Sequence, residues 1–263
     1  MYTLSKRPTI KLFTMATDLN DIGLAQFKQT ADKWEWDYDI FHLNKQTINS
    51  TNGAAQYKME LLKHVLEHLK YNYYDFVGIV DGYDILVNNS PEECIKRLYE
   101  KQLQNSLVVG FESIWNVIPF SLVYNIHLFN KLIYKIFKTM AYSHSCKKPY
   151  NLGMVLGSSS SIILYISKML TLWDTTNICD SNVCSEQKYF EQILKSESFT
   201  CENNTLYIDE NECFVKNFVR CYIKNTNTNT IFLHFPGKRH ICNLFGYQTH
   251  FYNTIMNNNC NTD

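Results

Sequence analysis

The chain has 263 residues, of which 45% are hydrophobic and 14% aromatic, so it can bury a substantial core. Its 25 Lys and Arg residues balance 25 Asp and Glu residues, which argues against a broad surface for nucleic acid or membranes. No apolar stretch reaches the ~20 residues of a membrane helix, and no secretory signal is visible. We therefore expect a near-neutral, globular, cytoplasmic protein with no membrane or nucleic-acid partner.

The nine cysteines are scattered without CxxC spacing. Cys179 and Cys184, or Cys213 and Cys221, could pair, and reduced thiols are the favoured interpretation.

Short apolar runs alternate with helical patterns in the first half of the chain. The pattern predicts strands over residues 10–14, 38–43, 75–80 and 106–111. Helices are predicted up to about Trp34, over residues 52–69, and from Ser90, where a Ser cap is followed by Pro and then Glu. This β-α-β-α-β-α-β order predicts an α/β fold with a doubly wound, mostly parallel central sheet flanked by helices.

The second half is less regular. The pattern predicts strands over 154–157 and 231–233 and helices over 162–173 and 186–194. Because no linker divides the chain, we expect a single domain over residues 1–250, followed by a polar, flexible tail over 251–263.

The third predicted strand ends at two carboxylates, in the sequence Val80-Asp-Gly-Tyr-Asp84. Ligands in open α/β sheets bind at the carboxyl ends of strands, and paired carboxylates suit Mg²⁺ or Mn²⁺ bound to substrate phosphates. Asp-Gly is also an ordinary turn signal, so the motif alone leaves a metal site and a plain turn equally open.

Several further segments occur in the order typical of one family. They are Thr14-Met-Ala-Thr17, Gly53-Ala-Ala-Gln-Tyr-Lys58, Phe111-Glu112-Ser, Asn151-Leu-Gly, Glu186-Gln187 and His234-Phe-Pro-Gly-Lys238. With the acidic motif, these segments make the chain resemble the glycosyltransferase domain of the procollagen lysyl hydroxylase (PLOD) family, over roughly residues 10–247. That family has the GT-A fold and includes stand-alone and viral relatives.

The resemblance implies roles for these residues in binding a UDP-sugar. Asp81, Asp84 and His234 would hold Mn²⁺ or Mg²⁺. The mixed nitrogen and oxygen ligands suit Mn²⁺ somewhat better. The residues implied to contact the donor are Thr14, Ala16, Thr17, Lys58, Tyr83, Asn151, Gly237 and Lys238. Without the resemblance the alternatives stay open: His234 as an ordinary strand-end histidine, Tyr83 as a tyrosine packed under its loop, Asn151 as a turn residue, and Lys238, more than Lys58, as a solvated charge.

Glu186 and Glu112 are the candidates for the carboxylate that assists deprotonation of an acceptor hydroxyl. Glu186 is alternatively a solvated residue in the first turn of a helix, where a negative charge is favoured. Ser185-Glu186 stands where the family has a richer acidic cluster, and Phe235-Pro236 replaces the family's Gly-Asn. These departures leave open a scaffold protein that keeps the fold without the activity.

We predict a metal-dependent glycosyltransferase that moves a sugar from a UDP-sugar to a hydroxyl of a protein or glycan. The resemblance suggests hydroxylysine, or its galactosylated form, in a collagen-like protein. Residues 125–150 are an acceptor-side insertion or a plain helix and loop. A nucleotidyltransferase ranks third among the interpretations. That class usually has a Gly-rich, basic loop after its first strand, whereas this chain has Ala16-Thr-Asp-Leu-Asn20 there. The oligomeric state is not predicted.

Overall fold

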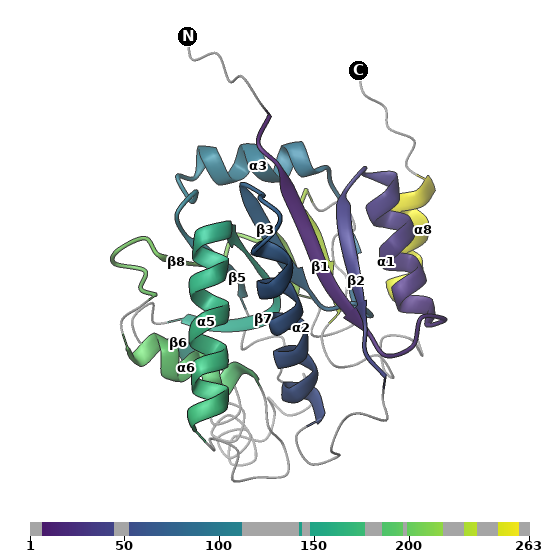
Figure 1. Cartoon of the computed structure of the whole chain (residues 1–263). Helices are drawn as coiled ribbons and strands as arrows, with labels where there is room; N and C mark the ends of the chain where they lie inside the picture. The colour runs from purple at the N-terminus through teal and green to yellow at the C-terminus, as the bar shows by residue number, and fades with distance from the viewer. Residues whose placement is uncertain are drawn as a thin grey trace, which may run out of the picture.

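The computed structural model describes residues 7–44, 53–111, 142–143, 148–176, 186–196, 199–217, 229–235 and 247–257 (Figure 1). Over these ranges the chain forms a seven-stranded sheet and a smaller three-stranded sheet, with helices on both faces of the larger one.

The first half of the chain builds three parallel strands. Strand β1 (Ile10–Ala16) pairs with β2 (Asp37–His42) on one side and with β3 (Phe76–Val80) on the other. Helices α1 (Ile22–Lys33) and α2 (Gly53–Leu69) make the two crossovers. The predicted strands and helices of this half are confirmed to within a few residues. The three strands end at the same edge, where ligands bind in sheets of this kind.

The other half of the sheet contains one reversed strand. Strand β7 (Lys148–Ser158) lies between β3 and β5 (Leu107–Phe111) and is antiparallel to both. Strand β8 (Leu206–Asp209), which the sequence does not predict, runs parallel to β5 at the edge, and β6 (Tyr142–Ser143) pairs with β7. The sheet order β2-β1-β3-β7-β5-β8 is thus mostly parallel, as predicted, with β7 reversed at its centre.

The smaller sheet has the order β4-β10-β9. Strand β10 (Phe232–His234) is antiparallel to β4 (Ile85–Val87) and parallel to β9 (Val215–Asn217). The sequence predicts β10, and it predicts neither β4 nor β9. In this register His234 pairs with Ile85, the residue after Asp84.

Apolar side chains alternate between the two faces of the large sheet, as the period of a strand requires. Phe13, Val77 and Val109 face a cluster that contains α2, α5 (Ser159–Thr175) and α6 (Glu186–Lys195). Leu12 and Val108 face a second cluster that contains α1, α3 (Pro91–Glu100) and the small sheet. Figure 1 shows α2 and α5 side by side over one face of the sheet.

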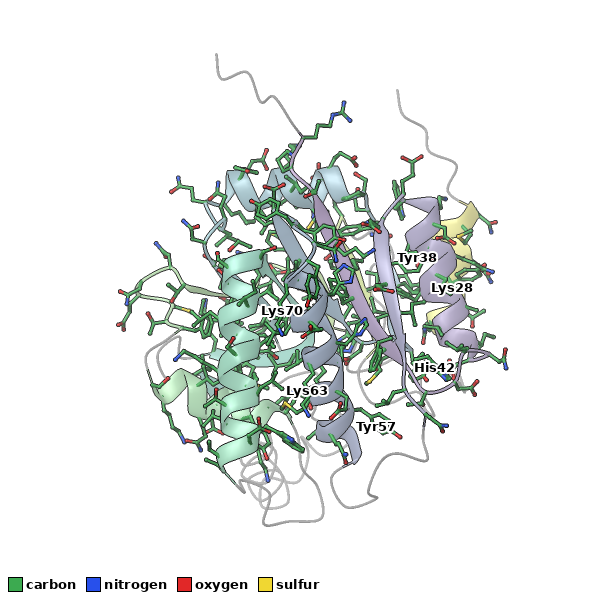
Figure 2. All side chains as sticks on the ribbon, viewed as in Figure 1. Lys28, Tyr38, His42, Tyr57, Lys63 and Lys70 are labelled. Atoms are coloured by element: carbon green, nitrogen blue, oxygen red, sulfur yellow. The ribbon has the colours of Figure 1, made fainter. Side chains whose placement is uncertain are left out.

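The helix ends follow the sequence signals in part. Ser90 caps α3, with its hydroxyl accepting from the backbone N–H of Glu93, as predicted. Helices α1 and α3 are each followed by a non-glycine residue with positive φ, Glu35 and Gln102, both at 57°. Figure 2 shows Lys63 on α2 and Lys70 directly after its last residue, and both form ion pairs on the solvent side, with Glu60 and Glu67 respectively.

Two predictions are wrong in this part of the description. Residues 251–257 are no flexible tail: they belong to helix α8 (Tyr247–Asn257), in which Phe251 and Ile255 are buried. Helix α8 packs on α1, so its apolar side chains enter a core instead of water. Cys201 is disulfide-bonded, against the expectation of reduced thiols, whereas Cys94 and Cys213 are free. Among the described helices, none has the length and apolar character needed to cross a membrane.

Candidate metal and donor site

Asp81, Asp84 and His234 come together at the carboxyl edge of the large sheet. One ligand atom from each lies within 4.8 Å of the others. The His234 Nε2 atom is 3.6 Å from the Asp81 Oδ2 atom and 3.8 Å from the Asp84 Oδ1 atom. Two carboxylates and an imidazole form a donor set that suits Mn²⁺ or Mg²⁺ and leaves octahedral positions for phosphate oxygens and water. The three residues therefore fit a divalent ion.

Backbone hydrogen bonds fix the two sides of this cluster. Asp81 follows the last residue of β3, and its N–H donates to the Gly153 carbonyl of β7 at 2.9 Å. The Phe235 N–H, next to His234, donates to the Asp84 carbonyl at 2.8 Å. The acidic loop is thus tied to the large sheet at one end and to the small sheet at the other.

Gly153 makes room for the imidazole of His234. A Cβ atom at residue 153 would lie 2.0 Å from the Cε1 atom and 2.4 Å from the Nε2 atom of His234. The β7–β5 register shifts beside this residue: Val109 pairs with Val155, but Gly110 pairs with Asn151. A glycine within a strand typically marks such an irregularity or a close approach, and here it marks both.

Lys58 reaches the cluster from α2. Its side chain is buried, and its Nζ atom donates to the Asp81 Oδ1 atom at 2.9 Å and to the Leu152 carbonyl at 3.4 Å. Of the two interpretations of Lys58, the solvated surface charge is therefore wrong. The ammonium group lies where it neutralises part of the acidic loop.

The charges of the site shift one another's proton affinities. Burial alone would raise the pKa of Asp81, but Lys58 and His234 lower it to about 2. Burial opposes the charged form of His234, yet the Asp81 and Asp84 carboxylates outweigh it and raise its pKa. Burial likewise opposes the charge on Lys58, and the carboxylates of Asp81, Glu186 and Asp84 together raise its pKa. Each charge in the cluster is stabilised by its neighbours.

Glu186 is the first residue of α6, and its carboxylate is among the charges that act on Lys58. The first turn of α6 is anchored by Tyr150, whose hydroxyl donates to the Gln187 carbonyl at 3.1 Å. Tyr150 is fully buried, and burial followed by the nearby Glu191 and Glu186 carboxylates raises its pKa. The structure thus brings Glu186 toward the acidic loop.

Tyr83 holds the end of β1. Its hydroxyl accepts from the backbone N–H groups of Thr17 and Asp18, and its ring packs partly into the core. Ala16 and Thr14 are fully buried, and the Thr14 hydroxyl donates to the Val80 carbonyl at 2.8 Å. The Thr14 side chain therefore supports the junction of β1 and β3, and its contact with the donor stays a prediction.

Asn151 is 8% exposed, and its Oδ1 atom accepts from the Gly153 N–H at 2.7 Å. The side-chain oxygen of Asn151 thus stabilises the irregular part of β7 through this hydrogen bond. Glu112, Gly237 and Lys238 lie outside the described residues, as does most of the segment 125–150. Sequence reasoning missed Gly153 and Tyr150 as supports of the site. Gly153 directly precedes the predicted strand 154–157, and a glycine at that place was the available signal.

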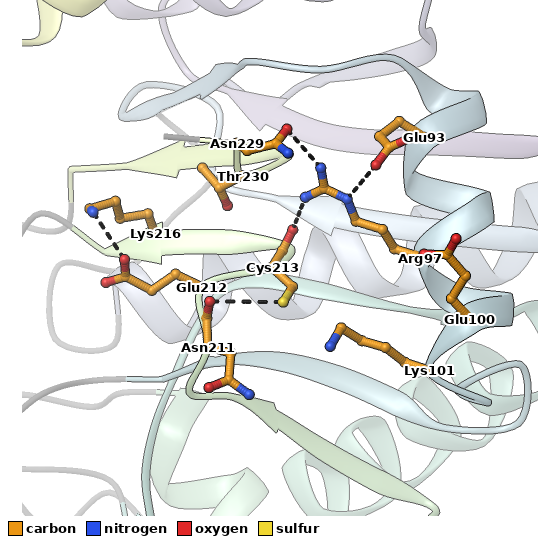
Figure 3. Close-up of a pocket in the computed structure, with 10 residues that line it drawn as sticks. All are labelled: Glu93, Arg97, Glu100, Lys101, Asn211, Glu212, Cys213, Lys216, Asn229 and Thr230. Atoms are coloured by element: carbon orange, nitrogen blue, oxygen red, sulfur yellow. Dashed lines mark hydrogen bonds and ion pairs between the residues drawn. The ribbon is translucent and has the colours of Figure 1, made fainter. Parts of the chain in front are cut away.

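A pocket away from the metal cluster lies near the other end of β10 (Figure 3). Its volume is about 470 Å³, and Arg97 of α3 is one of the residues that line it. The Arg97 guanidinium donates to Glu93, to the Cys213 carbonyl and to Asn229, so it joins α3 to the strands of the small sheet. None of the predicted site residues that the structure describes lines this pocket.

The comparisons with known proteins agree with this geometry. A family model described as PLOD GT domain matches residues 6–120. The chain is similar to the solved structure of a glycosyltransferase involved in the glycosylation of the major capsid of PBCV-1. That match has a TM-score of 0.57 and 10% identity, and covers 93% of this chain and 99% of the other.

A second solved structure, A197 from STIV, gives a TM-score of 0.37 at 12% identity over 71% of this chain and 78% of its own. That score is too low to support an argument. No curated protein matches the sequence.

The fold is that of a glycosyltransferase, with a mostly parallel sheet whose carboxyl edge carries the acidic loop. The resemblance to the PLOD glycosyltransferase domain is confirmed over residues 6–120, which include β1, β3 and the Asp81–Asp84 loop. Together, these two findings support a glycosyltransferase, as the sequence predicts.

Proposed function

We propose that this protein is a metal-dependent glycosyltransferase that uses a UDP-sugar as donor. The observation that carries the proposal is the cluster of Asp81, Asp84 and His234, whose ligand atoms lie within 4.8 Å of one another at the carboxyl edge of the sheet. A divalent ion held there, Mn²⁺ in preference to Mg²⁺, would neutralise the charge that develops on the diphosphate leaving group.

In this proposal the Lys58 ammonium group places a second positive charge, besides the metal ion, next to the diphosphate leaving group. Its ammonium group is held by Asp81 at 2.9 Å, so it is ordered before the donor binds. A charge that is already ordered costs little reorganisation when charge develops in the transition state. Lys58 therefore stabilises the departing diphosphate and keeps Asp81 ionised.

Glu186 is the residue that we assign to the acceptor. Its carboxylate acts on Lys58 from the first turn of α6, across the site from the end of β3. In this role Glu186 takes the proton of the acceptor hydroxyl as the oxygen attacks the anomeric carbon and the carbon–oxygen bond to the diphosphate breaks. Glu112 remains a second candidate for this proton from the sequence.

The acceptor that we propose is a hydroxyl group on a protein or glycan, with hydroxylysine or its galactosylated form in a collagen-like chain as the first substrates to test. The support is the match of residues 6–120 to the PLOD glycosyltransferase domain.

The decisive experiment is calorimetric titration of UDP into the protein with and without Mn²⁺. We expect binding that requires Mn²⁺ in the wild type and is lost in Asp84→Ala. Asp174→Asn, which changes an exposed carboxylate near the end of α5, is the matched control and should bind as the wild type does. Equal UDP binding with and without metal would contradict the metal-dependent site, and no binding in either condition would favour a scaffold protein.

Metal-dependent binding leads to the second measurement, which is turnover. UDP-glucose, UDP-galactose and UDP-N-acetylglucosamine are each assayed for hydrolysis and for transfer to peptides that contain hydroxylysine or galactosyl-hydroxylysine. Glu186→Gln should lower the rate of transfer and leave UDP affinity within about twofold of the wild type, because the residue acts on the acceptor.

A further inference from the structure

Helix α8 contacts both sides of the metal cluster. Gln248, which is 4% exposed, donates from its side-chain amide to the Tyr83 carbonyl at 3.1 Å. Tyr83 stands between Asp81 and Asp84 in the acidic loop. Phe251, one turn further along α8, packs against Phe235, with ring centroids 5.9 Å apart. Phe235 directly follows His234, so one helix contacts the loop that carries the carboxylates and the strand end that carries the imidazole.

Helix α8 is itself fixed to α1 at both ends. The Gln26 side chain donates to Thr249 at 3.2 Å near the start of α8. The ammonium group of Lys33 donates to the carbonyls of Ile255 and Met256 at the other end, where the helix dipole favours a positive charge. Figure 1 shows the two helices packed together at the side of the sheet.

Helix α1 also approaches the acidic loop directly. A Cβ atom at Gly23 would lie 2.0 Å from the Tyr83 carbonyl oxygen, so only a glycine fits there. The Tyr83 carbonyl is thus enclosed between the backbone of Gly23 and the amide of Gln248. With its carbonyl held on both sides, the loop has little freedom to change the spacing of Asp81 and Asp84.

We propose that α8 is a structural part of the metal centre, in which Gln248 acts as a positioning residue for the acidic loop and Phe251 for the end of β10. The inference rests on the proposed metal site and adds the residues that set its geometry. Substitution of a residue that orients a metal ligand typically lowers metal affinity, even though the residue does not touch the ion.

The test is a titration of the full chain with Mn²⁺ in the presence of excess UDP, with free Mn²⁺ followed by electron paramagnetic resonance. Gln248→Met keeps the length of the side chain and removes its donor. We expect Mn²⁺ affinity to fall about three- to tenfold, the range set by one neutral hydrogen bond. Asn253→Leu, a similar change on the exposed side of the same helix, is the control and should bind Mn²⁺ as the wild type does.

Thermal unfolding of the same samples separates positioning from plain stability. A purely structural role would lower the melting temperature of Gln248→Met and leave the Mn²⁺ affinity of the folded protein unchanged, which would overturn the inference alone. If Gln248→Met does not fold, Phe251→Leu replaces it, and affinity equal to that of the wild type would again overturn the inference. Failure of the wild type to bind Mn²⁺ would overturn the proposed metal site and this inference together.

Discussion

Replacing Gly153 by alanine tests how the metal cluster is assembled. The new methyl carbon would lie 2.0, 2.4 and 2.7 Å from three atoms of the His234 ring. Contacts shorter than 3.0 Å require a shift, and the ring is only 1% exposed, so it has no open space to enter. The substitution must therefore displace either the imidazole or the strand that carries it.

The size of the effect follows from these contacts. Overpacking of a buried site costs about 1–3 kcal/mol of unfolding free energy. A displaced ligand should weaken Mn²⁺ binding by about 10- to 100-fold, as changes in groups that orient metal ligands do. In a His234→Ala background the same methyl group enters space that the imidazole has left. The stability cost of Gly153→Ala should then fall below about 0.5 kcal/mol, which makes the two changes strongly non-additive.

Urea unfolding of the two single variants and the double variant measures this coupling, and Mn²⁺ titration measures the loss of affinity. Gly78→Ala is the matched control, because its methyl group would meet the flexible end of Leu12 at 2.6 Å, away from the cluster. It should lower stability and leave Mn²⁺ affinity within about twofold. Wild-type Mn²⁺ affinity in Gly153→Ala, or equal stability costs in both backgrounds, would refute the reasoning.

Three further predictions follow from the charges and backbone of the described residues. His234 has a raised pKa in the metal-free fold, so its stabilising contribution is complete below its ordinary value of 6.5 and is lost as pH rises through the folded value. Urea unfolding in EDTA should show a loss of stability above pH 6.5 that is smaller in His234→Gln, and parallel pH curves would contradict this. Lys58→Met should weaken UDP binding by about tenfold or more but uridine binding by less than about twofold, because the ammonium group acts on the phosphates. Calorimetry measures both affinities, and an equal loss of affinity for UDP and uridine would show that Lys58 does not act on the phosphates. Gln102→Gly should raise the unfolding free energy by about 0.5–1 kcal/mol, because φ of 57° after α3 strains any residue with a Cβ atom. Unchanged stability in urea would mean that the extra chain entropy of glycine offsets the relief of strain.

Most strands and helices in the first half of the chain are encoded by local sequence patterns. The strands β1, β2 and β3 and the helices between them have strong apolar periodicity, and Ser90 caps α3 as its sequence indicates. Two short strands were not predicted from the sequence at all. Strands β4 and β9 have three residues each and derive their stability from pairing with β10, a partner distant in sequence.

Helix α8 was missed for a different reason. Its segment is rich in Asn and Thr, and composition alone made it resemble a tail. The few apolar residues that matter, Phe251 and Ile255, are spaced four apart and bury against Leu86, Leu233 and Phe235. Tertiary contacts outweighed local composition, since most helix stability in proteins comes from packing of an apolar face.

The sequence by itself determined the chemistry of the site: two carboxylates after a buried strand, a late histidine and a lysine from the segment before the third strand. Their convergence was decided by the tertiary structure. The register of β4 on β10 sets His234 beside Asp84, the glycine at 153 admits the imidazole, and α2 delivers Lys58 to Asp81. Residue types can be recognised along a chain, but distances between atoms far apart in sequence depend on strand pairing and packing, which no local pattern encodes.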